Sequence, residues 1–177
     1  DECGFDQRCV PTYAYSPKGT PAIASYKTSP DRCRYTLTMA VTSYDGSYNY
    51  SLSPSSCKAN DFQNFLTRLP YPKGTVIVLD NASVHRTKAV LSTATDKGYH
   101  LLFIPPYTPE ANPIENVFGL IKRSYYKLRF CDSFTSVPSA IHYSISSLSS
   151  KSIANTFSHV QTVMHYLFTV QIRRIQN

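Results

Sequence analysis

Hydrophobic and polar residues alternate from Arg34 to Tyr44 (RYTLTMAVTSY), which is typical of a β-strand with one buried face. Asp45-Gly46 follows, a dipeptide that favours a type I′ hairpin turn, and Tyr48 to Leu52 predicts the second strand of the hairpin. The preceding stretch from Tyr13 to Pro21 is rich in turn residues, so we expect a loop that leads into this strand pair.

The middle of the chain switches between two kinds of apolar pattern. Asn60 to Leu69 places its apolar side chains at helical spacing, and Val84 to Lys97 predicts a second helix that is closed by Gly98. Thr75 to Leu79 (TVIVL) and His100 to Ile104 (HLLFI) are continuous apolar runs, as expected of strands buried on both faces in the parallel part of an α/β sheet.

A further helix is predicted to begin at Asn112, with Pro113 at its first position, and to run to about Leu128. Its buried stripe consists of Ile114, Val117, Phe118 and Ile121. Beyond Cys131, the Ser-rich stretch to Lys151 and the segment from Ala154 to Arg174 predict two more helices. The order of elements describes an α/β fold, with a mixed sheet flanked by helices.

Length and composition predict one folded unit. The chain has 177 residues, 42% of them hydrophobic and 16% charged, which argues against intrinsic disorder and against two ordinary domains. No apolar run approaches the roughly 20 residues needed to cross a bilayer, and no signal-peptide pattern opens the chain. The five cysteines are widely spaced without a CxxC pair, so we interpret them as reduced thiols of a protein that is not secreted and has no membrane partner.

The net charge of +7 is unevenly distributed along the chain. Of the eleven acids only Asp132 follows Glu115, whereas seven basic residues do: Lys122, Arg123, Lys127, Arg129, Lys151, Arg173 and Arg174. Such a basic half favours a polyanionic partner, of which nucleic acid is the commonest. A solvated basic surface without a partner is the alternative.

Two acids are candidates for chemistry. Asp80 directly follows the strand TVIVL, so its carboxylate is expected to project from the sheet edge into a cleft, where a cation or hydrogen-bond donors must offset its lost hydration. Glu115 lies in the first turn of the helix that begins at Asn112. Each has a structural alternative, because Asp80 could close an Asx turn and Glu115 could be a capping-box residue that favours the helix dipole.

Together these residues carry a resemblance to a known family. The segment DNASVH from Asp80 to His85, the 34 residues between Asp80 and Glu115, and the segment PPYTPEANPIENVFGLIK resemble the mariner superfamily of DDE transposases. The N-terminal DECGF, with Arg8 and the later YSPKG, is similar to the segment that carries the first acid of that family. The resemblance covers residues 1 to about 130.

The resemblance implies a ribonuclease-H-like fold, with residues 1–130 as the DDE catalytic core and residues 131–177 as a C-terminal helical extension of the same domain. It also implies that Asp1, Asp80 and Glu115 are the catalytic acids. The first strand of such a sheet would lie upstream of residue 1, so we expect the strand to be truncated in this chain. The three carboxylates would bind two divalent ions, Mg²⁺ or Mn²⁺, because these hard cations prefer oxygen ligands.

His85 accompanies the second acid in the family pattern and could face the metal site, although packing against the sheet is an equal alternative. By its position, Asn112 is expected to cap the helix rather than to act in catalysis. For DNA contact we favour four basic residues near the end of the same helix, with Tyr125 and Tyr126 between them, and a weaker candidate in the SPKG loop: Lys122, Arg123, Lys127, Arg129 and Lys18.

The function implied is DNA strand cleavage and strand transfer, with transposon ends and target DNA as partners, as a possible homodimer. The protein would be nuclear in a eukaryotic host and in the cytoplasm or nucleoid otherwise. Two alternatives remain open: a decayed or domesticated relative that binds DNA without cleaving it, and a ribonuclease-H-like nuclease without strand transfer.

Overall fold

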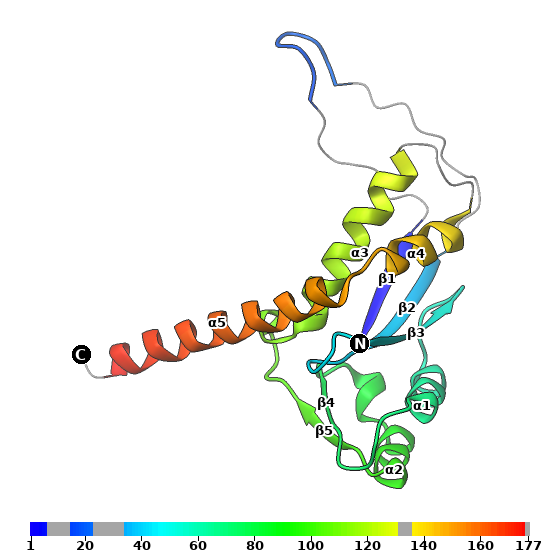
Figure 1. Ribbon diagram of the computed structural model, residues 1–177, viewed down its shortest axis with the longest axis vertical. Helices are drawn as coiled ribbons and strands as arrows, with labels where there is room; N and C mark the ends of the chain where they lie inside the picture. The colour runs from blue at the N-terminus through cyan, green and yellow to red at the C-terminus, as the bar shows by residue number, and fades with distance from the viewer. Residues whose placement is uncertain (7–14, 23–33, 131–135, 176–177) are drawn as a thin grey trace.

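The computed structural model describes residues 1–6, 15–22, 34–130 and 136–175 (Figure 1). Its first sheet is antiparallel and has the strand order β1-β2-β3, formed by Glu2–Asp6, Arg34–Val41 and Tyr48–Ser53. Glu2 is opposite Thr38 in the β1–β2 ladder. Cys3 and Phe5 of β1 and Leu37 and Met39 of β2 are buried in the core with the helices, and Thr36 and Thr38, which alternate with the β2 pair, are buried as well. The predicted hairpin is confirmed.

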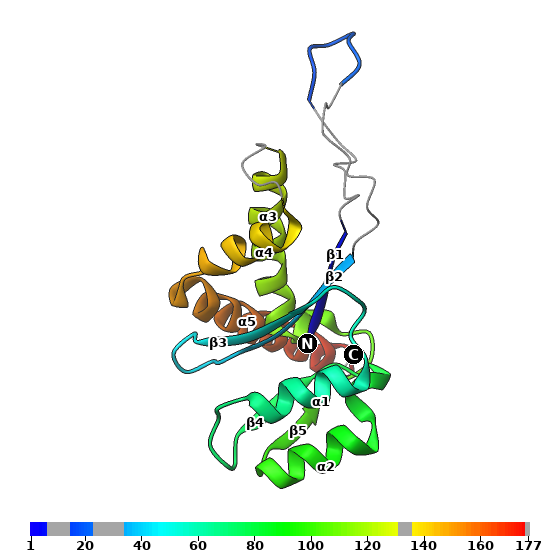
Figure 2. The same cartoon turned by 90° about the vertical axis from the view of Figure 1, so that its right-hand side faces the viewer.

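The second sheet is parallel and has two strands, β4 (Val76–Leu79) and β5 (His100–Phe103). Helices α1 (Ala59–Arg68) and α2 (Lys88–Lys97) pack against it, as Figure 2 shows. Their apolar residues form one core with the strands, and the buried members are Phe62, Phe65, Leu66, Leu69, Leu79, Val90, Ala94 and Tyr99. This core holds the end of β4 in place.

The three remaining helices cover the antiparallel sheet. They are α3 (Pro113–Phe130), preceded by the short 3₁₀ helix η2 (Pro109–Ala111), then α4 (Val137–Ser146) and α5 (Ser150–Ile175). Figures 1 and 2 show α3 and α4 beside β1 and β2, while the C-terminal part of α5 extends away from the body. The second core joins all three helices to the sheet, and its large side chains that are fully buried are Phe5, Leu37, Met39, Ile121, Tyr125, Ile141, Ile145 and Ile153.

Three details differ from the sequence prediction. The turn at Asp45-Gly46 is longer than two residues, because β2 ends at Val41 and the amide of Thr42 donates to the carbonyl of Ser47. The helix expected from Val84 is split. Ser83–Arg86 forms the 3₁₀ helix η1, and α2 begins only after Thr87, whose hydroxyl accepts from the amide of Val90. The extended backbone of Thr87 interrupts the helix.

The third difference concerns β4 and β5, which were expected to be buried on both faces. Val76, Val78 and Leu102 are 57%, 44% and 55% exposed, whereas Leu79 is 2% exposed. Helices α1 and α2 cover only one face of this small sheet, and within the described residues β4 and β5 pair only with each other. The expected single mixed sheet is therefore divided into an antiparallel and a parallel part.

One further expectation is wrong: the first strand does not lie upstream of residue 1 but is β1, which follows Asp1 and pairs along its whole length with β2. The remaining expectations for the elements are confirmed. The structure has the mixed α/β composition predicted, with helices at the predicted places before β4, after β4, at Pro113 and in the C-terminal third. In the described part of the chain, Cys3 and Cys57 are free thiols, and the remaining cysteines (Cys9, Cys33 and Cys131) lie outside it. None of the helices described there has the length and hydropathy of a membrane span.

Candidate active site

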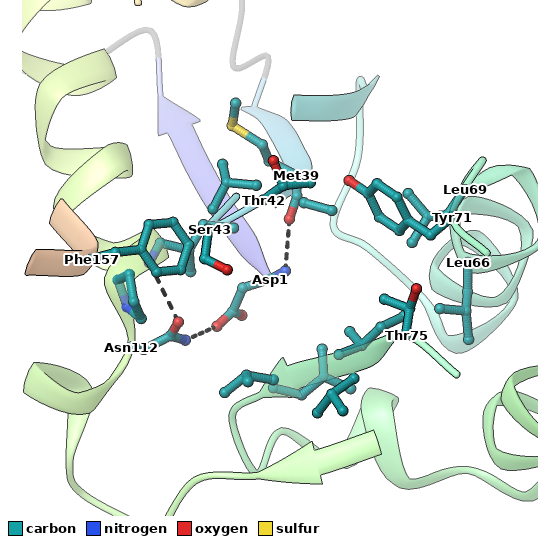
Figure 3. A pocket seen from close by; sticks show the side chains of 18 of the residues that line it. Asp1, Met39, Thr42, Ser43, Leu66, Leu69, Tyr71, Thr75, Asn112 and Phe157 are labelled. Carbon is teal, nitrogen blue, oxygen red and sulfur yellow. Dashed lines mark hydrogen bonds between the residues drawn. The ribbon is translucent and has the colours of Figure 1, made fainter. Parts of the chain in front are cut away.

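Asp1 lies where the antiparallel sheet meets the start of α3. Its α-amino group donates to the carbonyl of Met39 at 3.0 Å, and the amide of Met39 donates back to its carbonyl at 2.9 Å. The side-chain amide of Asn112 donates to Oδ2 of Asp1 at 2.7 Å, as the dashed lines in Figure 3 show. The Asp1 carboxylate is thus fixed by a residue 111 positions away in the sequence.

Asp80 follows β4 and has a half-exposed side chain. Its Oδ1 accepts from the amide of Ala82 at 2.8 Å, so the Asx turn considered from the sequence is present. The amide of the next side chain, Asn81, donates to the carbonyl of Ile104, which joins the carboxyl ends of β4 and β5. The turn and this bond together set the position of Asp80 at the edge of the small sheet.

His85 is completely buried in η1, with its ring packed 4.3 Å from the ring centroid of Phe62 on α1. Its Nε2 is 3.0 Å from Oε2 of Glu2. Its Nδ1 is 2.8 Å from Oδ1 of Asp80. The two atoms are close enough for a hydrogen bond but are not aligned for one, so Nδ1 makes no hydrogen bond. The ring therefore joins the end of β4 to the start of β1.

These contacts bring three possible metal ligands together. One carboxylate oxygen each from Asp1 and Asp80 and one ring nitrogen of His85 all lie within 4.8 Å of one another. Two carboxylates at this separation repel each other unless a cation or donors compensate. A buried imidazole nitrogen without a hydrogen bond beside them is a ready ligand, so the residues fit a divalent cation.

Glu115 is not part of this group. Its exposed side chain lies in the first turn of α3, where it lines a cleft of about 260 Å³ together with Glu110 and His159. It is still near enough to Asp1 to act on it electrostatically. Burial lowers the pKa of the Asp1 α-amino group, whereas the charges of Glu2, Asp80 and Glu115 raise it. The convergence expected of three acids is present for two of them, and the role of Glu115 stays a prediction.

An apolar cavity of about 710 Å³ lies beside the cluster, between the end of β2 and strand β4. In Figure 3 Asp1 and Asn112 are at one side of this cavity, and Leu66 and Thr75 are at the other. Asp1 is the only acid among the described residues that line it, and Asp80 and His85 do not contribute. An apolar lining does not suit a phosphate, so we place the chemistry at the edge of this cavity rather than inside it.

The proposed DNA-contacting residues fall into two groups. Arg123 and Lys127 are exposed on α3, and Lys18 is exposed in the turn at residues 15–22. Lys122 and Arg129 are half-buried. Burial raises the pKa of the Cys3 thiol, and the ammonium of Lys122 opposes this effect, which places that ammonium beside β1.

The neighbouring aromatic residues on α3 do not form an exposed surface. Tyr125 is 1% exposed, and its ring packs edge-on against Phe5 with the centroids 5.0 Å apart. The helix turns this position into the core, so Tyr125 adds no exposed ring between the basic residues. Tyr126 is half-buried against the same cluster.

Sequence reasoning missed two residues of the site. Glu2 holds His85. It was missed because it is adjacent to Asp1, and neighbouring strand residues normally point to opposite faces, so the two were not expected to serve the same site. Asn112 was expected to cap α3, and its Oδ1 does accept from the amide of Ile114 at 3.4 Å. The shorter bond from Asn112 to Asp1 had no sequence signal, because it depends on how α3 packs against β1.

Solved structures share this architecture at low sequence identity. A Mos1 mariner paired-end complex with Mn matches with a TM-score of 0.69 and 18% identity over 90% of this chain and 51% of that chain. A Mos1 transposase paired-end complex with left transposon end matches with a TM-score of 0.67 and 18% identity, over 90% of this chain and 50% of that chain. The chain spans about half the length of these proteins.

A more distant match is an intasome of simian T-cell lymphotropic virus in complex with the PP2A regulatory subunit B56 gamma. Its TM-score is 0.55 at 18% identity, covering 67% of this chain and 42% of that chain. No curated protein sequence matches the chain. The fold is thus the ribonuclease-H-like α/β fold of DNA transposases, as the sequence predicted.

The family follows from a match to the sequence itself. Residues 1–137 match the family model of the DDE superfamily endonucleases. The matched range includes the start of β1, the end of β4 and the start of α3. This chain belongs to that superfamily, and its fold is similar to that of the Mos1 mariner transposase structures. Members of the superfamily generally use divalent metal ions.

Proposed function

We propose that this domain catalyses metal-dependent cleavage of DNA strands at transposon ends and their transfer to a target. The observation that carries the proposal is the convergence of Asp1 and Asp80 with His85 within 4.8 Å, in a chain of the DDE superfamily. Asp1 and Asp80 are the two acids that the resemblance assigns to the first and second catalytic positions.

The neighbouring residues orient the two carboxylates for binding a cation. Asp1 accepts one hydrogen bond at each oxygen, from the amide of Glu2 at 2.9 Å and from Asn112 at 2.7 Å. Asp80 accepts one from Ala82. A carboxylate oxygen has more than one lone pair, so these bonds position the groups and leave acceptor sites directed at the cluster.

Two divalent cations, Mg²⁺ or Mn²⁺, would supply the charge that activates the attacking oxygen and stabilises the leaving oxygen in an in-line displacement. We assign Asp1 and Asp80 as ligands and Glu115 as the third acid. The first turn of α3, which carries Glu115, begins directly after Asn112 and is therefore tied to Asp1.

DNA would lie along the exposed basic side of α3. Arg123 and Lys127 are exposed there, and the chain carries a net charge of +7. Each phosphate contact releases condensed counterions, so the affinity should fall steeply with salt concentration. A transposon end and a target would both be held in this way, and a homodimer would hold paired ends.

The decisive test is nicking of supercoiled plasmid DNA in Mn²⁺ by the protein that carries this domain, with Asp80→Asn compared to Asp96→Asn. Asp96 is exposed near the C-terminal end of α2, away from η1, and serves as the matched control. Losing a metal ligand removes several kcal/mol of transition-state stabilisation, so Asp80→Asn should nick at least about 100-fold more slowly while DNA binding is kept. Equal rates in the two variants would contradict the proposal.

DNA binding without cleavage is a second candidate function, favoured by the position of Glu115 outside the group formed by Asp1, Asp80 and His85. It predicts salt-dependent binding of plasmid DNA and no Mn²⁺-dependent nicking by the unaltered protein. A nuclease without strand transfer would nick the plasmid but form no joined products with a DNA that has a free 3′-hydroxyl.

A further inference from the structure

We propose that Nδ1 of His85 is itself a ligand of the cation held by Asp1 and Asp80, and that Glu2 is the positioning residue that orients the His85 ring. This inference rests on the proposed function and deepens it. It changes the ligand set from carboxylates alone to two carboxylates and one imidazole, and so predicts which divalent cations the site prefers.

The protonation of the ring follows from Glu2. An ionised carboxylate can only accept hydrogen bonds, so Nε2 of His85, 3.0 Å from Oε2 of Glu2, must carry the hydrogen. In the neutral ring Nδ1 then has a free lone pair. Oε1 of Glu2 accepts from the thiol of Cys57 at 3.7 Å, so this carboxylate is held at both of its oxygens.

The surroundings of Nδ1 suit a positive charge. Nδ1 is completely buried, makes no hydrogen bond, and lies 2.8 Å from an oxygen of Asp80. A lone pair and a carboxylate oxygen at that distance repel each other, and a buried polar atom without a partner costs about 1–3 kcal/mol. A cation between Nδ1, Asp80 and Asp1 removes the repulsion and gives the nitrogen a partner.

The ring is also unable to turn away from the two acids. Phe62 packs against it at 4.3 Å from α1, and Glu2 holds its far side from β1. The three ligand atoms come from the start of β1, from the end of β4 and from η1, so the packing of separate elements sets their spacing. Such rigidity is what an ordered metal site needs.

The donor set predicts a preference among metals. Oxygen ligands suit Mg²⁺ and Ca²⁺, whereas an imidazole nitrogen favours transition metals, with affinity rising from Mn²⁺ toward Cu²⁺. A carboxylate that accepts from the other nitrogen of a metal-bound histidine raises its basicity, and its loss typically costs 10–100-fold in metal affinity. We therefore expect the site to bind Mn²⁺ more tightly than Mg²⁺, and Glu2 to contribute to that difference.

The first experiment is electron spin echo envelope modulation on the unaltered protein loaded with Mn²⁺ in the absence of DNA, with histidine labelled with ¹⁵N. We expect coupling of Mn²⁺ to one imidazole nitrogen, and its loss in His85→Gln. The matched control is His142→Gln, because His142 is exposed on α4 and bonds Tyr50 away from the site. Mn²⁺ bound without nitrogen coupling in the unaltered protein would overturn the proposal.

The second experiment separates positioning from a mere structural role of Glu2, by measuring the Mn²⁺ dissociation constant of two variants. Glu2→Ala removes the acceptor and should weaken binding about 10–100-fold. Glu2→Gln keeps an acceptor oxygen for Nε2–H and should restore most of the affinity and the nitrogen coupling. Equal loss in both variants, or no loss in Glu2→Ala, would contradict the role of Glu2.

Circular dichroism melting of each variant identifies those that fail to fold. The measurement of nitrogen coupling to Mn²⁺ in the unaltered protein needs no substitution, so it tests the proposal even if a variant does not fold. The two proposals fail separately. A protein that binds Mn²⁺ through His85 but never nicks DNA contradicts the proposed function alone. A protein that nicks DNA without nitrogen coupling contradicts only the ligation by His85.

Discussion

Replacing Asn112 with alanine removes two hydrogen bonds of unequal strength at the junction of α3 and β1. The bond to Asp1 is 2.7 Å long, charge-assisted and partly buried, and such bonds contribute about 1.5–3 kcal/mol. The capping bond to the amide of Ile114 is 3.4 Å long, so its contribution should be near the low end for a helix cap, about 0.5 kcal/mol. Asn112→Ala should therefore lower the free energy of unfolding by about 2–3.5 kcal/mol.

Asn112→Ser separates the two contributions. Serine is as good a helix cap as asparagine, but its side chain is too short to keep the hydrogen bond to the Asp1 carboxylate. If the bond to Asp1 dominates, Asn112→Ser should regain only about 0.5 kcal/mol over Asn112→Ala. The control is Asn116→Ala, an exposed position one turn further along α3, where a change within about 0.5 kcal/mol is expected.

The assay is urea unfolding followed by circular dichroism, with the slope of each transition checked for constancy. Two results would refute the reasoning. If Asn112→Ser is as stable as the unaltered protein while Asn112→Ala is not, the helix cap carries the energy. If Asn112→Ala is as stable as Asn116→Ala, the bond to Asp1 contributes nothing in solution.

Other predictions concern the DNA surface, the small sheet and the turn after β2. Lys127→Ala should reduce the slope of log affinity against log salt by roughly 0.9 if Lys127 contacts a phosphate, and an unchanged slope in a filter-binding titration would exclude that contact. Val78→Thr should change the free energy of unfolding by less than about 0.5 kcal/mol, because Val78 is 44% exposed, whereas Leu79→Ala at 2% exposure should cost about 2–5 kcal/mol. The hydroxyl of Thr42 and then the amide of Ser47 lower the pKa of Asp45 from 3.8 to about 2. Because the pKa of Asp45 is lower in the folded than in the unfolded protein, its ionised carboxylate stabilises the fold above the unfolded-state pKa, and this stabilisation is lost as the pH falls. The difference in the free energy of unfolding between the unaltered protein and Asp45→Asn should therefore shrink between about pH 4 and pH 2.

Local sequence patterns predicted the helices and strands, because these elements depend mainly on residues that are close together in the chain. The alternation in RYTLTMAV, the apolar run TVIVL and the Asn-Pro start of α3 all lie where elements were expected. The break at Thr87 was overlooked, although a threonine before a helical run is a known cap signal. The exposure of Val78 had no signal, because the sequence alone does not tell whether a second layer covers a strand.

The site was predicted only in part, for a related reason. Asp80 could be selected because an acid after an apolar strand is unusual, and Asp1 through the resemblance. Glu2 and Asn112 depend on contacts across 83 and 111 positions, which local patterns do not contain. Glu115 was expected to join the two aspartates, and its exposed side chain in the first turn of α3 leaves that role a prediction.

The central claim is that Asp1 and Asp80 hold a divalent cation together. Anomalous scattering from crystals of the protein grown with Mn²⁺ tests it most directly, because the signal locates the ion independently of any model of the protein. We predict a peak in contact with a carboxylate oxygen of each aspartate. No peak between them, at a Mn²⁺ concentration that saturates the protein in solution, would contradict the account.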